Sequence, residues 1–524
     1  MSIQPFTFET ELRSLAQLDR AAGWRWAIWF GVVLGLTAVI GGLLLTGQPS
    51  VAAVGWALYA LALAAIIYEP RYGIYLIIFL SLYGDILIAP WYPFNKNFSS
   101  MESLFFVNKS LIFSPLEVTL VVTLLAWLGG GRMRRKIDFY QGPLFKPVMI
   151  FAGFIVFGLV FGLSRRGNVN IALWEARPIF YLFVIFLMAS NLLRKREHLS
   201  HALWAAMLAL FLESLGGISH LLIDLHGSLA GVEAIGEHSM SVHENTFFVF
   251  MIAAWFYRAS RAKRYVLPAL APCVLWTYAA NQRRASYIGL VLALGLIFII
   301  LFKSNRKLFW MVVPPLAALG VLYTIAFWNA SGPIAQPARA IRSVIAPVKD
   351  GRDDRSNVYR VIENINSNYT IHRQPLTGVG FGQKFFIVAP LPDISFFIWW
   401  EYITHNSIIW MWMKSGAGGF AAMVFLIASA LFTGVRALWR MPGGDLSAIV
   451  LTATLYLVIH FVYAYVDMSW DNQSMLYVGL MLAIINTVES ITAVPIPTPR
   501  KRWNWQPDPS PVPGLLPNPE SAGQ

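Results

Sequence analysis

The sequence predicts an all-α protein with about 12–14 transmembrane helices and one large extracytoplasmic loop. Hydrophobic residues make up 57% of its 524 residues and charged residues only 13%, which is too apolar for a soluble protein of ordinary composition. Apolar runs of about 16–24 residues recur along the chain, and each is long enough to cross a hydrocarbon core about 30 Å thick. The 20 Trp and 36 Phe residues suit lipid contact and the membrane interface.

About fourteen apolar runs are candidate spans, although Asp85 interrupts the third and the fourth is short. They begin near residues 24, 51, 73, 115, 146, 173, 200, 243, 264, 286, 308, 406, 447 and 472. Basic clusters in the short connecting loops all fall on one side of this topology, which the positive-inside rule assigns to the cytoplasm. The clusters lie at residues 132–136, 194–196, 258–264, 303–307, 436–440 and 500–502. The large loop therefore faces outside.

These runs divide the chain into five parts. Residues 1–23 form a polar cytoplasmic segment without a cleavable signal, and residues 24–327 hold about eleven spans. Residues 328–405 form the extracytoplasmic loop, and residues 406–494 hold about three further spans. Residues 495–524 are rich in proline, so we expect a disordered cytoplasmic tail.

The charge and cysteine content narrow the function classes. A net charge of +13 would suggest nucleic acid in a soluble chain, but here the basic residues concentrate in the cytoplasmic loops. We expect membrane lipids and no nucleic acid as partners. Cys273 is the only cysteine, and His243-Glu244 does not continue into HExxH because residue 247 is Phe. No phosphate-binding or dinucleotide motif is found, so we expect no metal and no cofactor.

The large loop carries the most informative pattern. An amphipathic helix is expected there, because apolar residues recur three and four positions apart at Val358, Val361, Ile362 and Ile365. Arg355, Arg360 and Glu363 lie on its other faces.

A glycine-rich segment and a histidine follow this helix. Gly378, Gly380 and Gly382 break regular structure and allow close backbone approach, so we expect them to shape a loop over the site. His405 and Asn406 then open the next span. On a continuous helix Gly416 would share a face with His405, about 16 Å deeper, where a neighbouring helix could approach closely.

Two of these motifs resemble the bacterial O-antigen ligase and O-antigen polymerase superfamily. The first is PLTGVGFG at residues 375–382, followed by His405-Asn406 and by Gly416 with ten residues between histidine and glycine. The second is the segment from Arg284 to Ile288, which is similar to that family's arginine, three residues, aliphatic motif. Both occur in the family's order and together they cover about a third of the chain. Lys414 stands where the family commonly has an acidic residue.

The resemblance implies a GT-C-like membrane glycosyltransferase in the bacterial inner membrane, with its active site facing the periplasm. Its donor would be an undecaprenyl-diphosphate-linked glycan, and its acceptor a glycan or the lipid A core. His405 is then the candidate general base, since the pKa of an unperturbed imidazole lies near 6.5. Arg284 is the first candidate diphosphate ligand and Arg283 could exchange roles with it, because a guanidinium holds phosphate oxygens bidentately.

Other polar residues are secondary candidates. Arg177, Arg355, Arg360 and Asn406 could contact the diphosphate or the glycan, although Arg177 could instead form an ion pair with Glu175 or another acid. Lys414 needs a partner such as Asp467 or a substrate phosphate if it is buried.

The motifs leave the acceptor open. The chain could be a ligase, a polymerase or a protein O-glycosyltransferase of the same superfamily. A transporter or flippase of lipid-linked saccharides is the alternative from another class, because it too would hold a diphosphate with arginines. That alternative predicts two repeated halves with broken helices in corresponding places, and the sequence contains no such repeat.

Overall fold

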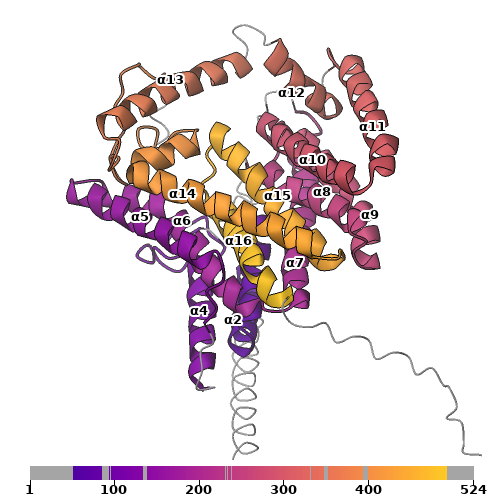
Figure 1. Cartoon of the computed structure of the whole chain (residues 1–524). Coiled ribbons are helices and arrows are strands. Elements are labelled where there is room, and N and C mark those ends of the chain that lie inside the picture. Colours follow the sequence, from indigo (N-terminus) through magenta and orange to yellow (C-terminus); the bar gives the residue numbers. More distant parts are fainter. Residues whose placement is uncertain are drawn as a thin grey trace, which may run out of the picture.

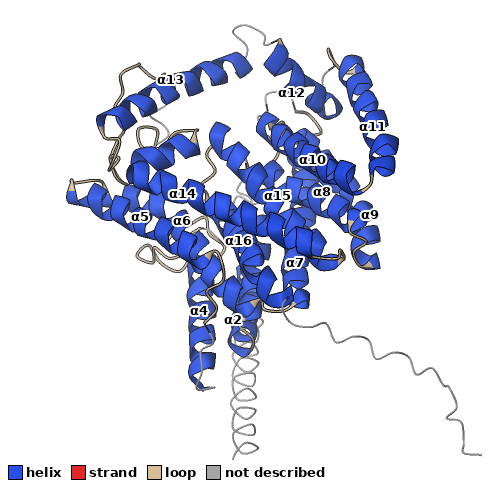
Figure 2. Cartoon of the chain, viewed as in Figure 1, coloured by secondary structure: helices blue, strands red, loops and turns tan. Residues whose placement is uncertain are grey.

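The computed structural model describes residues 51–84, 94, 96–133, 139–229, 232, 234–237, 239–330, 332–346, 352–392 and 399–492. These residues form helices and no strand, so the all-α prediction is confirmed (Figure 2). The expected first span and the proline-rich tail lie outside the described residues.

Thirteen helices begin within a few residues of the thirteen remaining expected span starts. They are α2 (Val51–Tyr68), α3 (Arg71–Tyr83), α4 (Pro115–Met133), α5 (Phe145–Ser164), α6 (Val169–Leu192), α7 (Arg196–Ser219), α8 (Met240–Phe256), α9 (Arg261–Ala280), α10 (Arg284–Ser304), α11 (Arg306–Ala326), α14 (Ser407–Arg440), α15 (Asp445–Val466) and α16 (Asn472–Thr492). A π-helical turn, His220–Asp224, continues α7. The large loop adds α12 (Gln336–Ile345) and α13 (Arg352–Arg373).

Eight helices of the described part are long and apolar enough to cross a membrane: α5, α6, α7, α10, α11, α14, α15 and α16. The apolar stretches of α2, α3 and α4 are shorter, and α8 has 17 residues. The chain is therefore a multi-pass membrane protein, with fewer long apolar helices in the described part than the 12–14 spans expected.

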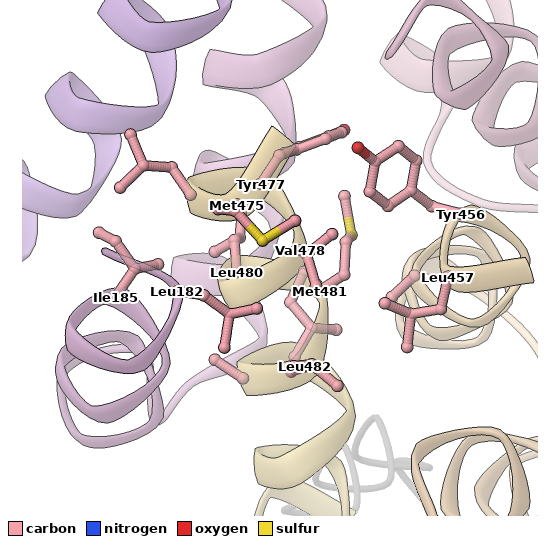
Figure 3. Close-up of a cluster of buried hydrophobic side chains, with 14 of the residues drawn as sticks. Leu182, Ile185, Tyr456, Leu457, Met475, Tyr477, Val478, Leu480, Met481 and Leu482 are labelled. Carbon is pink, nitrogen blue, oxygen red and sulfur yellow. The ribbon is translucent and has the colours of Figure 1, made fainter. Parts of the chain in front are cut away.

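The centre of the bundle is built on α15 and α16. Figure 3 shows α16 between Leu182 and Ile185 of α6 on one side and Tyr456 and Leu457 of α15 on the other. Most residues of both helices are buried, as expected of largely apolar helices that other helices surround. In contrast, α11 has no buried residue, and its main contacts within the described part of the chain are with α10 and α12, so much of its surface is left for lipid.

One end of the bundle, which we call the capped end, is crossed by α12 and α13 (Figure 1). The amphipathic helix expected near Val358 is confirmed as α13, but its apolar stripe points outward: Val358, Val361 and Ile365 are exposed. Its polar residues Glu363 and Asn366 are buried instead. The face of α13 turned toward the bundle is therefore polar, as expected of a helix that covers a polar site.

Candidate active site at the capped end

His405 lies directly before α14 and is held by Glu363 of α13. Its ring Nδ1 lies 2.7 Å from Glu363 Oε2, and its backbone N–H donates to the same oxygen at 3.2 Å. Only 3% of Glu363 is exposed. In the tautomer that makes this contact a hydrogen bond to an accepting carboxylate, Nδ1 carries the proton and the ring lone pair lies on Nε2. This is the tautomer that a general base requires.

Tyr359 of α13 also packs against His405. It lies one turn before Glu363 on α13, and its ring meets the His405 ring edge-on at 5.6 Å between centroids. Burial, together with the nearby Glu363 carboxylate, raises the pKa of the Tyr359 phenol far above its usual value. The phenol therefore stays protonated near neutral pH and cannot compete with His405 as a base.

The start of α14 is fixed beside the loop that joins α15 to α16. Asn406 caps α14, because its side-chain oxygen accepts a hydrogen bond from the Ile409 N–H at 3.0 Å. Ser407 donates to the Asp467 carbonyl at 3.0 Å and accepts from the Ser469 N–H at 2.9 Å. Asn406 therefore has a structural role in capping the helix, and Asp467 is brought close to the histidine.

Arg360 of α13 extends toward this loop. Its Nη2 lies 3.9 Å from Asp467 Oδ2, which is a long and weak ion pair, and 29% of its side chain is exposed. Arg360 and Glu363 are three residues apart on one face of the helix, so a cation and the histidine's partner project from α13 in the same direction. Arg355 is exposed two turns earlier and lies about 12 Å along the helix from Glu363.

Arg283 and Arg284 lie at the N-terminus of α10, where the helix dipole favours anions. Arg284 donates to Ser343 Oγ of α12 at 3.3 Å and to Asn357 Oδ1 of α13 at 3.5 Å. Arg283 precedes Arg284 in the chain. Arg284 contacts α12 and α13, and Arg360 belongs to α13, the helix whose Glu363 holds His405.

Arg177 is not part of this group. Its Nε lies 3.2 Å from Glu117 Oε1 of α4, and Glu117 also accepts the Ser114 N–H at 2.7 Å. The alternative of an ion pair with an acid is therefore the one observed, with Glu117 as partner and not Glu175.

The expectation that Gly416 continues the helix of His405 is wrong. Gly416 has φ 68° and ψ −176°, so α14 is broken there. The glycine-rich loop enters the break: Val379 N–H donates to the Met413 carbonyl at 2.8 Å, and Ala417 N–H donates to the Pro375 carbonyl at 2.9 Å. The close neighbour at Gly416 is therefore this loop and not another helix.

Lys414 is buried and has the partner that a buried lysine was expected to need, but that partner is Glu175 and not Asp467. Lys414 Nζ lies 2.8 Å from Glu175 Oε1 of α6, and neither side chain is exposed to solvent. Asp467 contacts Arg360 instead.

An apolar cavity of about 330 Å³ borders the start of α10 and the end of α15. Residues of α10, α14 and α15 line it: Ala285, Ile288, Ile408, Phe461, Val462, Tyr465 and Val466. Ala285 follows Arg284 in the chain and Val466 precedes Asp467, so the polar cluster and the apolar cavity share one rim. A molecule with a charged head and an apolar tail would fit both.

Sequence reasoning placed Glu363 on a helix face but gave it no role. The available signal was its position three residues after Arg360 on the polar side of the amphipathic pattern. No group of three or more His, Cys, Asp or Glu residues that could hold a metal ion occurs among the described residues. Comparison of the chain with protein-family models and with curated proteins finds no match.

Proposed function

We propose that this protein is an integral membrane glycosyltransferase that acts at the capped end, on the extracytoplasmic face of a bacterial inner membrane. Its donor is a glycan carried on undecaprenyl diphosphate, and it transfers or polymerises that glycan. The observation that carries the proposal is the 2.7 Å contact between His405 Nδ1 and buried Glu363, which leaves Nε2 as a base beside a group of arginines. The motif resemblance to O-antigen ligases and polymerases supports the donor class.

In the proposed reaction an acceptor hydroxyl attacks the anomeric carbon of the donor glycan. Its proton moves to His405 Nε2, a new carbon–oxygen bond forms, and the anomeric bond to the diphosphate breaks. The electron pair of that bond leaves with undecaprenyl diphosphate. Glu363 stabilises the imidazolium that forms, because its carboxylate accepts the Nδ1–H bond.

The arginines serve the leaving group. Negative charge builds on the diphosphate as the anomeric bond breaks, and the part-buried guanidinium groups of the site stabilise it. Arg284 and Arg283 add the N-terminal dipole of α10 to their own charge. The contact between Arg360 and Asp467 is long, at 3.9 Å, so a phosphate oxygen would readily replace Asp467 as the partner of Arg360.

In this proposal the apolar cavity binds the lipid part of the donor. Its lining residues belong to membrane-spanning helices, and it begins one residue from Arg284. A polyprenyl chain would lie along it with the diphosphate at the arginines. The donor arrives already activated, so the reaction needs no nucleotide.

The experiment is transfer by the purified protein in nanodiscs, with an undecaprenyl-diphosphate glycan as donor and donor binding measured alongside. We expect transfer by the wild-type protein, strong donor binding with little transfer by His405→Ala, and weakened binding by Arg284→Ala. His372→Ala and Arg373→Ala are matched controls, since both residues are exposed at the far end of α13. Normal transfer by both site variants would place the reaction elsewhere.

The same purified protein, reconstituted in liposomes, separates this function from transport. A flippase would move the donor between leaflets in liposomes and would release no undecaprenyl diphosphate. Movement without bond formation, abolished by Arg284→Ala and unaffected by His405→Ala, would favour the transporter.

A further inference from the structure

A buried ion pair lies beneath the glycine-rich loop. Lys414 Nζ lies 2.8 Å from Glu175 Oε1, and it also donates to the Gln383 carbonyl at 2.6 Å. The other carboxylate oxygen, Oε2, accepts the Gly382 N–H at 2.6 Å. One pair of charges thus binds the backbone of two consecutive loop residues, Gly382 and Gln383, to α6 and α14.

The loop fits its place only because of its glycines. Gly380 and Gly382 have φ of 90° and 75°, in the left-handed region. A Cβ on Gly380 would lie 2.3 Å from Gly162 Cα of α5, and one on Gly382 would lie 2.5 Å from the Asn168 carbonyl oxygen. The loop therefore sits against α5 and α6 backbone to backbone, with no slack for a shift.

The same loop is bonded to α13 on its other side. Phe386 N–H donates to Thr370 Oγ1 at 2.9 Å, and the Val388 N–H donates to Asn366 Oδ1 at 2.8 Å. Asn366 lies three residues after Glu363 on α13. In addition, Phe385 N–H donates to the Glu401 carbonyl at 3.0 Å, four residues before His405.

A continuous set of contacts therefore runs from the buried pair to the catalytic pair. We infer that Lys414 and Glu175 are positioning residues for the transfer reaction: through the loop they fix where Glu363 of α13 meets His405. This inference rests on the proposed glycosyl transfer. Neither residue touches the reacting atoms.

For this positioning role it matters which helix carries the acid and which carries the lysine, and not only that the two charges cancel. The loop offers an N–H at Gly382 and a carbonyl at Gln383, so it needs an acceptor on α6 and a donor on α14. Exchange of the two residues would keep the charges balanced. It would, however, place a lysine donor against the Gly382 N–H and a glutamate acceptor against the Gln383 carbonyl. A pair that merely neutralised itself in the membrane would tolerate the exchange.

Two double variants test the inference. Glu175→Gln with Lys414→Met removes both charges at similar side-chain volume, which often leaves stability unchanged. Glu175→Lys with Lys414→Glu exchanges them. Thermal unfolding, donor binding, kcat and KM would be measured for each, together with hydrogen exchange of the backbone amides of residues 378–389.

We expect both double variants to fold and bind donor, with kcat lowered 10- to 100-fold and the KM for donor unchanged, because a small displacement of catalytic groups has effects of that size. Amides of residues 378–389 should exchange at least ten times faster than in the wild type, while those of α16 stay protected. The single variant Lys414→Arg should keep a higher kcat than either double variant, because arginine keeps a cation and hydrogen-bond donors at this position.

Wild-type kcat in either double variant would overturn the inference. So would a lowered kcat with the loop amides still protected, or a global loss of folding in the uncharged double variant, which would make the pair a support of the whole bundle. If the wild-type protein itself transfers no glycan, the proposed function fails first, and the exchange data still report separately on the loop.

Discussion

Removal of Glu363 tests whether it acts through His405. Glu363→Ala deletes the carboxylate that accepts from Nδ1 at 2.7 Å and from the backbone N–H at 3.2 Å. A hydrogen bond to a charged group is worth about 1.5–3 kcal/mol, which corresponds to a loss of about 10- to 150-fold in transfer rate. General-base catalysis contributes about 10²- to 10⁴-fold, so His405→Ala should be the more severe variant.

The double variant gives the decisive comparison. If Glu363 works only by holding and stabilising His405, the pair His405→Ala with Glu363→Ala should transfer no more slowly than His405→Ala alone. Glu363→Gln should fall between Glu363→Ala and the wild type, since the amide oxygen still accepts one bond without the charge.

The assay is the initial rate of glycan transfer in nanodiscs at saturating donor, with donor binding measured for every variant. Losses that multiply in the double variant would refute the reasoning, because they would show that Glu363 and His405 act independently.

Four further variants probe the surrounding structure. Arg284→Ala should raise the dissociation constant of the donor at least tenfold in binding assays, because it removes a permanent cation from the diphosphate site, whereas equal affinity would contradict that role. Gly416→Ala should lower the melting temperature and transfer together, since its Cβ would lie 2.1 Å from the Leu376 carbonyl oxygen, while Gly153→Ala, which has open space around it, serves as control. Ile288→Trp should fill part of the apolar cavity and raise the KM for a long-chain donor more than for a short-chain one; an equal effect on both would argue against a lipid site. Arg177→Ala should destabilise the bundle by about 0.5–1.5 kcal/mol in unfolding assays, because it leaves part-buried Glu117 without its cation, and should change kcat little once folded protein is compared.

The helical fold follows from composition and periodicity. Apolar runs of membrane length located α5 and α10 because burial in lipid demands an unbroken apolar stretch, a signal carried by each segment alone. The period of three and four residues likewise predicted α13. It could not predict that the apolar stripe of Val358 and Val361 would face outward, since periodicity gives faces but not the neighbours they meet.

The candidate site was only partly predictable. His405, Arg284 and the loop glycines were found from their spacing and from a motif resemblance. Glu363 was given no role and Glu175 was considered only as a partner of Arg177. Their actual partners, His405 and Lys414, lie 42 residues away in one case and far along the chain in the other. The break at Gly416 was missed because glycine is compatible with a helix, and only the inserted loop requires its positive φ.

The central claim is that His405 is the base of a glycosyl transfer, and a single-turnover experiment tests it most directly. Wild-type protein and the His405→Ala variant, each loaded with undecaprenyl-diphosphate glycan in nanodiscs, would be mixed with acceptor and the release of undecaprenyl diphosphate followed. We predict equal donor occupancy and a release rate about 10²- to 10⁴-fold slower in the variant. Equal release rates from both proteins would contradict the account.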